Sequence, residues 1–476
     1  MIMQENIEKI CAAVLKQIMP SKKDRDRILV LARKLEEKVV SACEELGVEA
    51  EVRAEGSVAK DTWLSEEPDI DVFMRVSTKI PRESLGKVCL RVARKATRGS
   101  KQVERFAEHP YLEAFVDGVR VNIVPCYDVK RGDWHSATDR TPYHTNYIRK
   151  HLDTELRNEV RLLKRFMKGV GVYGAEIKVG GFSGYLCELL VLRYGGFVSV
   201  LKAFAGNSKR IVVDIEEHYK GRENELELLF KEPLVMVDPV DKGRNVASAV
   251  QVEKLHNFVA AARAFLNKPG KRFFYPPETV ALSAKELKKT LAERGSKIVT
   301  VLFGKIDVVP DILWGQLYKS QRSLRKLVEL NDFKMLRDVV WSDEKTLCMF
   351  IFELEDCCVP LVKKHLGPPL DKELECENFL AKYVSKPEAV VGPYVENGRW
   401  VVQIHRKYTD ACVLLQEKLK DGGRNAGVAE RVSLVLRRGF KVLLNEELAD
   451  VYMKNREFAK FITEFLSGKP RWLEPA

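Results

Sequence analysis

The sequence lacks long apolar runs, internal repeats and low-complexity tracts. A helix needs ~20 consecutive apolar residues to cross a bilayer, and no stretch approaches that length. The opening stretch, MIMQENIEKICAAVLKQIMP, predicts an amphipathic helix with interior charges rather than a secretory signal. We therefore expect a soluble protein of the cytoplasm with no membrane partner.

Paired cysteine motifs are also missing. The ten cysteines are scattered, and the one close pair, Cys357 and Cys358, does not have the CxxC spacing of a zinc or redox centre. We therefore expect reduced cysteines in the core.

Acidic residues are fewer than basic ones: the chain has 68 Asp and Glu and 80 Lys and Arg, which gives a formal charge of +12. That surplus favours a polyanionic partner, with nucleic acid as the first candidate.

A length of 476 residues predicts several domains. Two helical segments open the chain, and short strands are expected at 50–53, 70–76, 111–116 and 119–125, the last two joined by a turn at Asp117-Gly118. Helical periodicity then returns. One helix, over 155–168, has a basic side, for which a solvated face is the default interpretation: Arg157, Arg161, Lys164 and Lys168.

The stretch NKPGKRFFYPP, over 267–277, is typical of a linker. Beyond it, the order helix, strand, helix, strand, strand predicts a small α+β sandwich. A hairpin signal at Asn397-Gly398 and closing helices rich in Arg and Lys follow. A sandwich of this kind serves many purposes, so it does not by itself identify a function.

The strongest local signal is Gly56-Ser57, followed by Asp69 and Asp71. Side chains at i and i+2 of a strand share a face, so the two carboxylates lie ~7 Å apart and suit a divalent ion. A DxD pair alone is weak, because surface strands often carry alternating acids. A glycine-serine turn that opens a short helix adds backbone amides and a hydroxyl for phosphate oxygens. Together these residues predict a nucleoside triphosphate held against metal.

The stretch GSVAKDTWLSEEPDIDVF resembles the signature of the DNA polymerase β nucleotidyltransferase superfamily. More narrowly, the chain resembles the archaeal-type, class I CCA-adding enzymes, which are tRNA nucleotidyltransferases. The resemblance continues in order through HPYLEAFVDGVRVNIVPCY, SATDRTPYHTNYI, EVRLLKRFMKGVGVYGAEIKVGGFSGYLCELL, VDPVDKGRNVA and, more weakly, VENGRW. Successive blocks over most of the chain make it specific.

The resemblance implies an α+β multidomain fold. It has a polymerase-β-like nucleotidyltransferase head (1–146), a helical neck that binds nucleotide and tRNA (147–267), a ferredoxin- or RRM-like α+β body for the tRNA acceptor stem (268–385) and an α+β tail for the tRNA elbow (386–476). The implied activity adds C, C and A to the tRNA 3′ end from CTP and ATP without a nucleic-acid template, by two-metal phosphoryl transfer with Mg²⁺. A homodimer stays open.

The resemblance also implies roles for individual residues. Asp69 and Asp71 would be catalytic metal ligands, and position 122 would supply the third. The nucleotide would be surrounded by Gly56, Ser57, Lys60, Thr141, His144, Lys164, Tyr173 and Arg244. Ser57 would contact the triphosphate, and Arg244 would meet the base edge. Lys60 stands where some members have arginine, and lysine meets phosphate only as a point charge. Without their motifs, His144, Tyr173 and Arg244 have ordinary interpretations as loop, core and surface residues.

Asn122 departs from the family pattern, because VNIVPCY stands where VDVVPCY is expected. An amide is neutral and a poor base, so we expect nucleotide binding to persist and catalysis to fall by orders of magnitude. No neighbour is expected to substitute. Asp117 lies beyond a turn on the opposite strand face, and Asp128 is roughly 20 Å away along an extended chain.

Two other functions stay open from the sequence. Poly(A) polymerases and oligoadenylate synthetases share the glycine-serine and DxD parts, although the DKGRN block and the tail favour tRNA. A catalytically dead tRNA- or RNA-binding relative would keep the scaffold after loss of the third carboxylate. Asn122 is the residue that keeps this second alternative open.

Overall fold

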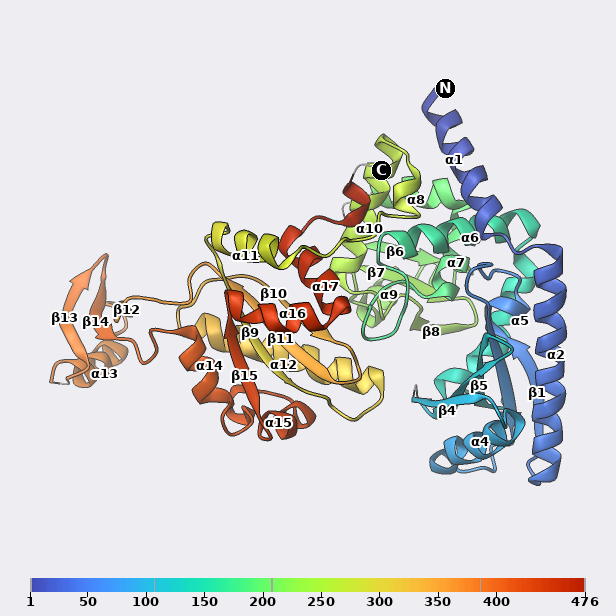
Figure 1. Cartoon of the computed structure of the whole chain (residues 1–476), viewed down its shortest axis with the longest axis horizontal. Helices are drawn as coiled ribbons and strands as arrows, with labels where there is room; N and C mark the ends of the chain where they lie inside the picture. Colours follow the sequence, from blue (N-terminus) through green and yellow to red (C-terminus); the bar gives the residue numbers. More distant parts are fainter. Residues whose placement is uncertain (1, 107, 207–208, 386, 475–476) are drawn as a thin grey trace. The chain divides into compact units, whose positions relative to one another are not determined.

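The structure is a computed structural model that describes residues 2–106, 108–206, 209–385 and 387–474. It divides into two compact units (Figure 1). The first comprises Met1–Glu278 with Lys469–Ala476, and the second comprises Thr279–Gly468. Among the described residues, no single helix is long and apolar enough to cross a membrane, although two helices bent at 88° to each other, Gly184–Tyr194 and Phe197–Gly206, pass that test as a pair.

A five-stranded mixed sheet forms the N-terminal part of the first unit. Its order is β1 (Ala50–Glu55), β2 (Asp69–Val76), β5 (Val119–Tyr127), β4 (Pro110–Val116) and β3 (Lys101–Phe106). Strands β2 and β5 are parallel, and the other neighbours are antiparallel. The predicted turn joins β4 to β5, and Asp117 and Gly118 both have positive φ, 48° and 75°.

Two long helices, α2 (Lys22–Glu45) and α4 (Arg82–Ala96), pack on this sheet (Figure 1). Helix α2 begins where Ser21 accepts a hydrogen bond from the Asp24 amide at 3.1 Å, as a capping residue should. Alternate residues of β2, Ile70 and Val72, are fully buried in the core that the helices complete. This alternation turns the intervening residues of β2 to the other face of the sheet, where the short helix α3 (Gly56–Ala59) lies near β2.

The rest of the first unit is mainly helical. Its helices are α1 (Ile2–Ile18), α5 (Thr141–His151), α6 (Thr154–Gly169), α7 (Gly184–Tyr194), α8 (Phe197–Gly206), α9 (Glu223–Leu229) and α10 (Val252–Asn267), with 3₁₀ turns η1 (Ala137–Arg140), η2 (Lys271–Phe273) and η5 (Arg471–Leu473). A small sheet has the order β6 (Ile211–Asp214), β7 (Leu234–Asp238) and β8 (Asp241–Asn245). Phenylalanine rings fill the core between the helices.

The stretch predicted as a linker, 267–277, ends next to the boundary between the two units, which falls between Glu278 and Thr279, but the structure buries its centre. Phe273 and Phe274 are fully buried and pack on Phe166 of α6, with ring centroids 6.0 and 5.6 Å away. Phe273 also stacks on Trp472, 5.5 Å between centroids, and Arg272 donates to the Trp472 carbonyl at 3.0 Å. The Pro and Gly residues that suggested a linker only flank this aromatic anchor.

The solvated face expected for the helix over 155–168 is also wrong in part. Arg161 and Lys164 of α6 are buried. Arg161 donates to the Trp63 carbonyl at 3.0 Å and pairs with Asp61 at 2.5 Å. Tertiary partners from the loop after α3 therefore replace water around these cations, which helical periodicity alone cannot reveal.

The second unit is built on an antiparallel sheet of order β10 (Met335–Ser342), β11 (Leu347–Leu354), β9 (Lys297–Gly304) and β15 (Phe440–Leu444). Around it lie α11 (Ala284–Glu293), α12 (Pro310–Leu330), α14 (Ala411–Leu419), α15 (Glu430–Leu436), α16 (Ala449–Lys454) and α17 (Arg456–Ser467), with η3 (Arg424–Ala426) and η4 (Asn445–Leu448). Strand β15 pairs with β9, so the chain leaves this sheet after β11, at Leu354, and returns to it only at Phe440.

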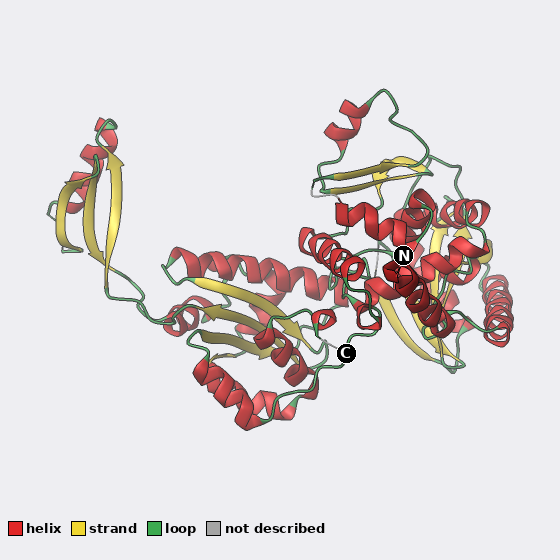
Figure 2. Ribbon diagram, turned by 90° about the horizontal axis from the view of Figure 1, so that it is seen from above, coloured by secondary structure: helices red, strands yellow, loops and turns green. Residues whose placement is uncertain are grey.

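A separate three-stranded sheet lies between those two passages of the chain. Its order is β12 (Val362–Pro369), β14 (Arg399–His405) and β13 (Ala389–Glu396), and helix α13 (Glu373–Tyr383) packs on it (Figure 2). The predicted hairpin turn is present, with Asn397 and Gly398 at positive φ. The predicted domain limits at 146, 267 and 385 stay predictions.

Candidate active site

The two carboxylates of the DxD motif share one face of β2. Asp69 and Asp71 lie opposite Arg120 and Asn122 in the parallel register of β2 and β5. The Nε atom of Arg120 donates to Asp69 Oδ1 at 2.7 Å, and a second guanidinium nitrogen contacts Asp69 Oδ2. Asn122 Nδ2 donates to Asp71 Oδ1 at 2.9 Å. Each carboxylate therefore already has a partner on the neighbouring strand.

The glycine-serine turn lies directly against the second carboxylate. Gly56 has φ +69°, and a Cβ atom added there would lie 2.1 Å from Asp71 Oδ2. Only glycine permits both that conformation and that approach. Burial raises the pKa of Asp71 to about 6, an effect that the hydrogen bond from Asn122 partly offsets. The nearby charges of Lys60 and Arg120 lower the pKa of Asp71 as well, but they do not outweigh the effect of burial.

A replacement for the missing third carboxylate is not found in the described part of the chain. There, no His, Cys, Asp or Glu forms a compact ligand group with Asp69 and Asp71. Glu113 of β4 lies opposite Asn122 in the sheet, which sequence reasoning missed, but its carboxylate accepts a hydrogen bond from Arg105 at 2.8 Å. Asp128 is paired with Arg75.

This donor set fits one divalent ion rather than two. Two carboxylates with an amide oxygen are suitable oxygen ligands for such an ion. They lack the third negative charge that a second ion needs. The guanidinium of Arg120 also competes for Asp69, because it engages both oxygens of that carboxylate.

A buried ion cluster connects the head to α6 and α7. Glu188 of α7 is fully buried and accepts hydrogen bonds from Lys60 Nζ at 2.6 Å, Thr62 Oγ1 at 2.5 Å and Lys164 Nζ at 3.3 Å. Burial alone would raise the pKa of Glu188, but the two lysines hold it below its usual value. Two ammonium groups share one carboxylate, so the cluster keeps a net positive charge.

Sequence reasoning missed Glu188. Its signal was a single acid inside the apolar stretch YLCELLVL, which predicts a buried partner for a cation. Burial lowers the pKa of Lys164, while Glu188 opposes that shift. Tyr173 lies next to Lys164, because a Cβ on Gly184 would come 3.0 Å from the tyrosine hydroxyl and 3.5 Å from Lys164 Nζ.

A second cluster gathers His144 and Arg244 around Asp238. Asp238, at the end of β7, is fully buried and accepts hydrogen bonds from His144 Nε2 at 2.8 Å and from Arg244 at 2.7 Å. The His144 ring stacks on Tyr185, with 4.0 Å between centroids. Lys60 Nζ lies 5.5 Å from the centroid of that tyrosine ring. Thr141, the first residue of α5, lies almost one turn before His144.

The structure therefore brings most of the predicted site residues into one chain of contacts. Gly56, Asp71 and Asn122 meet directly, Lys60 meets Lys164 through Glu188, and Lys60 meets His144 and Arg244 through Tyr185 and Asp238. Ser57 comes directly after Gly56 in α3, and Asp69 lies on the same face of β2 as Asp71.

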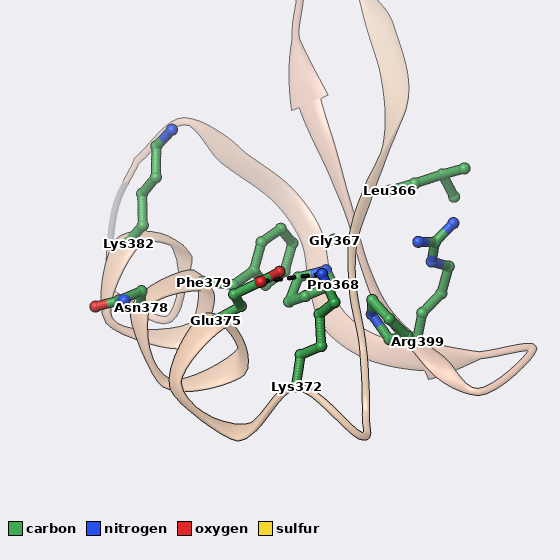
Figure 3. Close-up of a pocket in the computed structure, with 10 residues that line it drawn as sticks. Leu366, Gly367, Pro368, Lys372, Glu375, Asn378, Phe379, Lys382 and Arg399 are labelled. Atoms are coloured by element: carbon green, nitrogen blue, oxygen red, sulfur yellow. Dashed lines mark hydrogen bonds and ion pairs between the residues drawn. The ribbon is translucent and has the colours of Figure 1, made fainter.

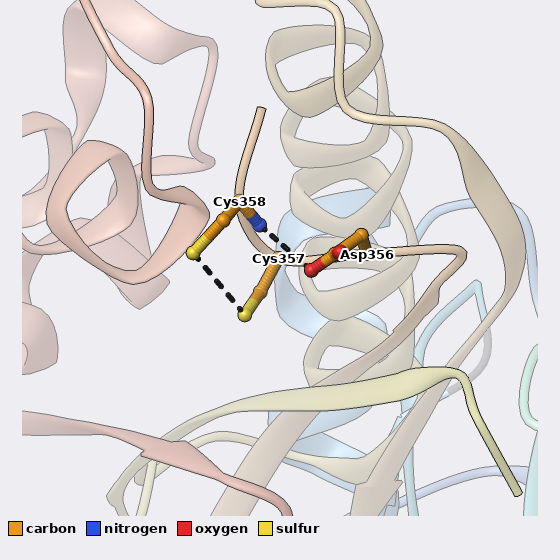
Figure 4. Close-up of side chains that lie close together, drawn as sticks. All are labelled: Asp356, Cys357 and Cys358. Atoms are coloured by element: carbon orange, nitrogen blue, oxygen red, sulfur yellow. Dashed lines mark hydrogen bonds between the residues drawn. The ribbon is translucent and has the colours of Figure 1, made fainter. Parts of the chain in front are cut away.

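Two further features lie in the second unit. A pocket of about 580 Å³ opens between β12 and α13 and is lined by Phe379, by the basic side chains of Lys372, Lys382 and Arg399, and by Glu375, which pairs with Lys372 (Figure 3). The Sγ atoms of Cys357 and Cys358 lie 3.9 Å apart beside Asp356 (Figure 4).

The described cysteines are all free thiols, as expected. The expectation that they belong to the core is wrong for Cys358, which is exposed. A cysteine in a loop after a strand escapes the burial that its residue type usually predicts.

The mixed sheet, the DxD pair and the glycine-serine turn define a polymerase-β-like nucleotidyltransferase, and the profile of the nucleotidyltransferase domain matches residues 36–151. Two more profiles match, the second domain of tRNA nucleotidyltransferase over 158–275 and the C-terminal domain of the CCA-adding enzyme over 294–445. The chain belongs to the family of CCA-adding enzymes. Nucleotidyltransferases of this superfamily generally use divalent metal ions.

The relatives cover almost the whole chain. The CCA-adding enzyme of Methanothermobacter thermautotrophicus is 37% identical over 95% of this chain and 97% of its own length. That of Methanosarcina barkeri is 36% identical, with 96% and 98% covered. These matches confirm the family, fold class and enzyme class expected from the motifs.

Among solved structures, a cytoplasmic RNA terminal U-transferase aligns with 57% of this chain and 98% of its own, at 15% identity and a TM-score of 0.45. This likeness is too low to support any inference about function.

Proposed function

We propose that this protein adds C, C and A to the 3′ end of tRNA from CTP and ATP, without a nucleic-acid template and with Mg²⁺, in the cytoplasm. The observation that carries the proposal is the contact between the Gly56-Ser57 turn and Asp71, continued by buried clusters to Lys164 and Arg244. It supplies, in one connected site, a place for an ion, a triphosphate and a base.

Different residues bind the triphosphate, the metal ion and the nucleoside. Ser57 and Lys60 bind the triphosphate, and Lys164 adds positive charge through the shared carboxylate of Glu188. A Mg²⁺ ion bound between Asp69 and Asp71 would supply charge neutralisation at the phosphates. Arg244, His144, Thr141 and Tyr173 face the nucleoside. This arrangement holds the nucleotide in place before any chemistry, which is the main task of a phosphoryl-transfer site.

Asn122 limits the chemical step. The 3′ hydroxyl of the tRNA must lose its proton to attack the α-phosphate, and the third carboxylate of such sites assists by holding the catalytic ion. The Asn122 amide is neutral, and its Nδ2 group points at Asp71 as a donor. The chain therefore binds nucleotide and turns it over slowly.

The test is a time course of CMP and AMP addition to a tRNA transcript that lacks its CCA end, with Mg²⁺, CTP and ATP. Binding of the same transcript is measured in parallel. The chain is expected to bind the transcript and to extend it slowly, and Asn122→Asp to extend it faster. Binding without extension by either protein would overturn the proposal.

The second candidate is a tRNA-binding relative that no longer catalyses. Asn122 and the Arg120–Asp69 ion pair favour it, because both reduce the negative charge available to metal. It predicts that Asn122→Asp fails to restore extension although tRNA binds tightly. Steep weakening of binding by salt is expected under both functions, because Lys and Arg contacts to phosphates release counterions.

The assignment of regions to parts of the tRNA follows the predicted domains. We place the acceptor stem on the residues of 268–385 and the elbow on those of 386–476. Lys382 and Arg399, which line the pocket beside α13, support a contact with RNA in that part of the chain. Exchange of Lys382 and Arg399 for Gln is expected to weaken tRNA binding without affecting CTP binding.

A further inference from the structure

We propose that Asp238 is a positioning residue that orients Arg244 and His144 as one base-recognition unit, and so sets the selectivity between CTP and ATP. The inference rests on the proposed function and deepens it. Arg244 and His144 come from separate parts of the chain, β8 and α5, and Asp238 is the residue on which both converge.

The carboxylate of Asp238 has every acceptor direction occupied. Its Oδ2 atom accepts from Arg244 Nη1 at 2.7 Å and from His144 Nε2 at 2.8 Å. Its Oδ1 atom accepts from the Val240 amide at 3.1 Å and from the Tyr185 hydroxyl at 3.2 Å. Because four donors share a fully buried carboxylate, loss of its charge leaves several of them without an adequate acceptor.

This arrangement fixes one edge of the guanidinium of Arg244 and leaves the rest available. The side chain is 36% exposed although its partner is fully buried. The charged hydrogen bond at Nη1 anchors one end of this planar group and restricts its motion, so its remaining N–H groups stay near one position before a base arrives. Such preorganisation lowers the entropic cost of recognition and sharpens the choice between bases.

His144 is held in the same unit from two sides. Its ring is hydrogen-bonded to Asp238 and stacked on Tyr185, which itself donates to the same carboxylate. Burial lowers the pKa of His144, although Asp238 opposes the shift. A change at Asp238 therefore moves the histidine, the tyrosine and the arginine together, which a simple structural ion pair would not do.

Asp241 offers a matched control only three residues away. It accepts from Arg140 Nε at 2.6 Å, so it also forms an arginine–carboxylate pair at β8. Neither Asp241 nor Arg140 contacts His144 or Arg244 through any hydrogen bond of the cluster around Asp238. Asp241→Asn removes a comparable charge nearby and should leave base selection unchanged.

The experiment measures equilibrium binding of CTP, ATP and inorganic tripolyphosphate to the full chain in complex with a tRNA that lacks its CCA end. Asp238→Asn is expected to weaken CTP and ATP binding about tenfold and to bring their affinities closer together, because a charged hydrogen bond is lost. The affinity of Asp238→Asn for tripolyphosphate, which carries no base, should stay within about twofold of that of the unchanged chain, because Ser57 and Lys60 bind the phosphates.

A thermodynamic cycle separates positioning from a general effect. Arg244→Gln and Asp238→Asn together should weaken CTP binding no more than the stronger single change, because both remove the same oriented guanidinium. Additive losses would overturn the proposal, as would equal losses for tripolyphosphate and CTP. If Asp238→Asn does not fold, the same cycle is run with Asp238→Glu, which keeps the charge and displaces it.

The binding measurements distinguish an error in the proposed function from an error in the role of Asp238. If the unchanged chain binds tripolyphosphate but neither nucleotide, the proposed function itself is wrong. If nucleotides bind selectively and Asp238→Asn changes that selectivity no more than Asp241→Asn does, only the role of Asp238 is wrong.

Discussion

Asp71 and Asp238 are both carboxylates of the first unit, but Asp71 is partly exposed and Asp238 is fully buried, and their partners differ. Asp71 has one amide donor from Asn122, and burial raises its pKa to about 6. Burial would raise the pKa of Asp238 as well, but His144 and Arg244 hold it at about 2. Asp71 feels Lys60 and Arg120 only at a distance, whereas Asp238 contacts an arginine and a histidine directly. Within one connected site, the carboxylate next to the metal position and the carboxylate next to the base-recognition residues therefore have different electrostatic surroundings.

The largest effect is expected from restoring the third carboxylate. Asn122→Asp should raise the rate of nucleotide addition to tRNA by roughly 100-fold or more, because a third negative charge beside Asp69 and Asp71 would then hold a catalytic ion. The rate is measured under single-turnover conditions with labelled tRNA and saturating Mg²⁺.

Asp238→Asn is the paired control and should not raise the rate in either background. An equal rate for the unchanged chain and Asn122→Asp would mean that the missing third carboxylate does not limit catalysis.

The decrease in the free energy of unfolding at low pH should depend on Asp238. The folded-state pKa of Asp238, about 2, lies below the ordinary value of 3.8, so its contribution is present above pH ~4 and is lost as the pH falls toward 2. The shift corresponds to stability on the order of 2 kcal/mol.

Urea unfolding of the first unit between pH 7 and pH 2 measures this loss. The pH dependence should become shallower in Asp238→Asn, which has no carboxyl to titrate. Identical pH profiles for the two proteins would exclude Asp238 as a source of acid sensitivity.

Substitution of Gly56 should have the next largest effect, on phosphate binding. Gly56→Ala places a Cβ 2.1 Å from Asp71 Oδ2 and forces an alanine into φ +69°. Affinity for tripolyphosphate with Mg²⁺ is expected to fall about tenfold, because the turn must move away from the carboxylate.

Gly118→Ala supplies the comparison. This residue also has positive φ, 75°, but nothing lies within 4 Å of its Cβ position. It should reduce stability through backbone strain and leave tripolyphosphate binding intact. A similar loss of binding in both variants would show that strain alone, without the contact to Asp71, accounts for the effect.

The smallest effect is expected at Arg120. Arg120→Gln should strengthen Mn²⁺ binding roughly threefold to fivefold, because the guanidinium no longer competes for Asp69 and the competition at a half-exposed ion pair is modest. Titration calorimetry or the electron paramagnetic resonance signal of free Mn²⁺ measures it without turnover. Arg105→Gln, which frees Glu113 instead, is the control. Unchanged or weaker Mn²⁺ binding in Arg120→Gln would show that Arg120 does not oppose the ion.

The sequence predicted the elements that local patterns determine. Alternation located β2 and β5, and turn residues located the hairpin at Asp117-Gly118. Motif spacing identified the DxD face, and the apolar face of Ile70 and Val72 confirmed its direction. These features depend on neighbours in the sequence, which is why they could be found there.

The remaining features depend on partners far apart in the chain. Glu188 lies 128 residues from Lys60, and Asp238 lies 94 residues from His144. The same limit explains why the burial of Arg161 and of the centre of 267–277 was missed, because distant contacts bury residues that looked exposed. Charge and proline patterns report the default environment of a segment, and tertiary packing overrides it.

The contact between Phe273 and Trp472 has a consequence for the order of folding. Residues 469–476 belong to the first unit but are translated after the whole of the second. During synthesis, therefore, the phenylalanine core of the first unit stays open on one side while nearly two hundred further residues are made. The ribosome completes the site-bearing unit last, although it begins that unit first.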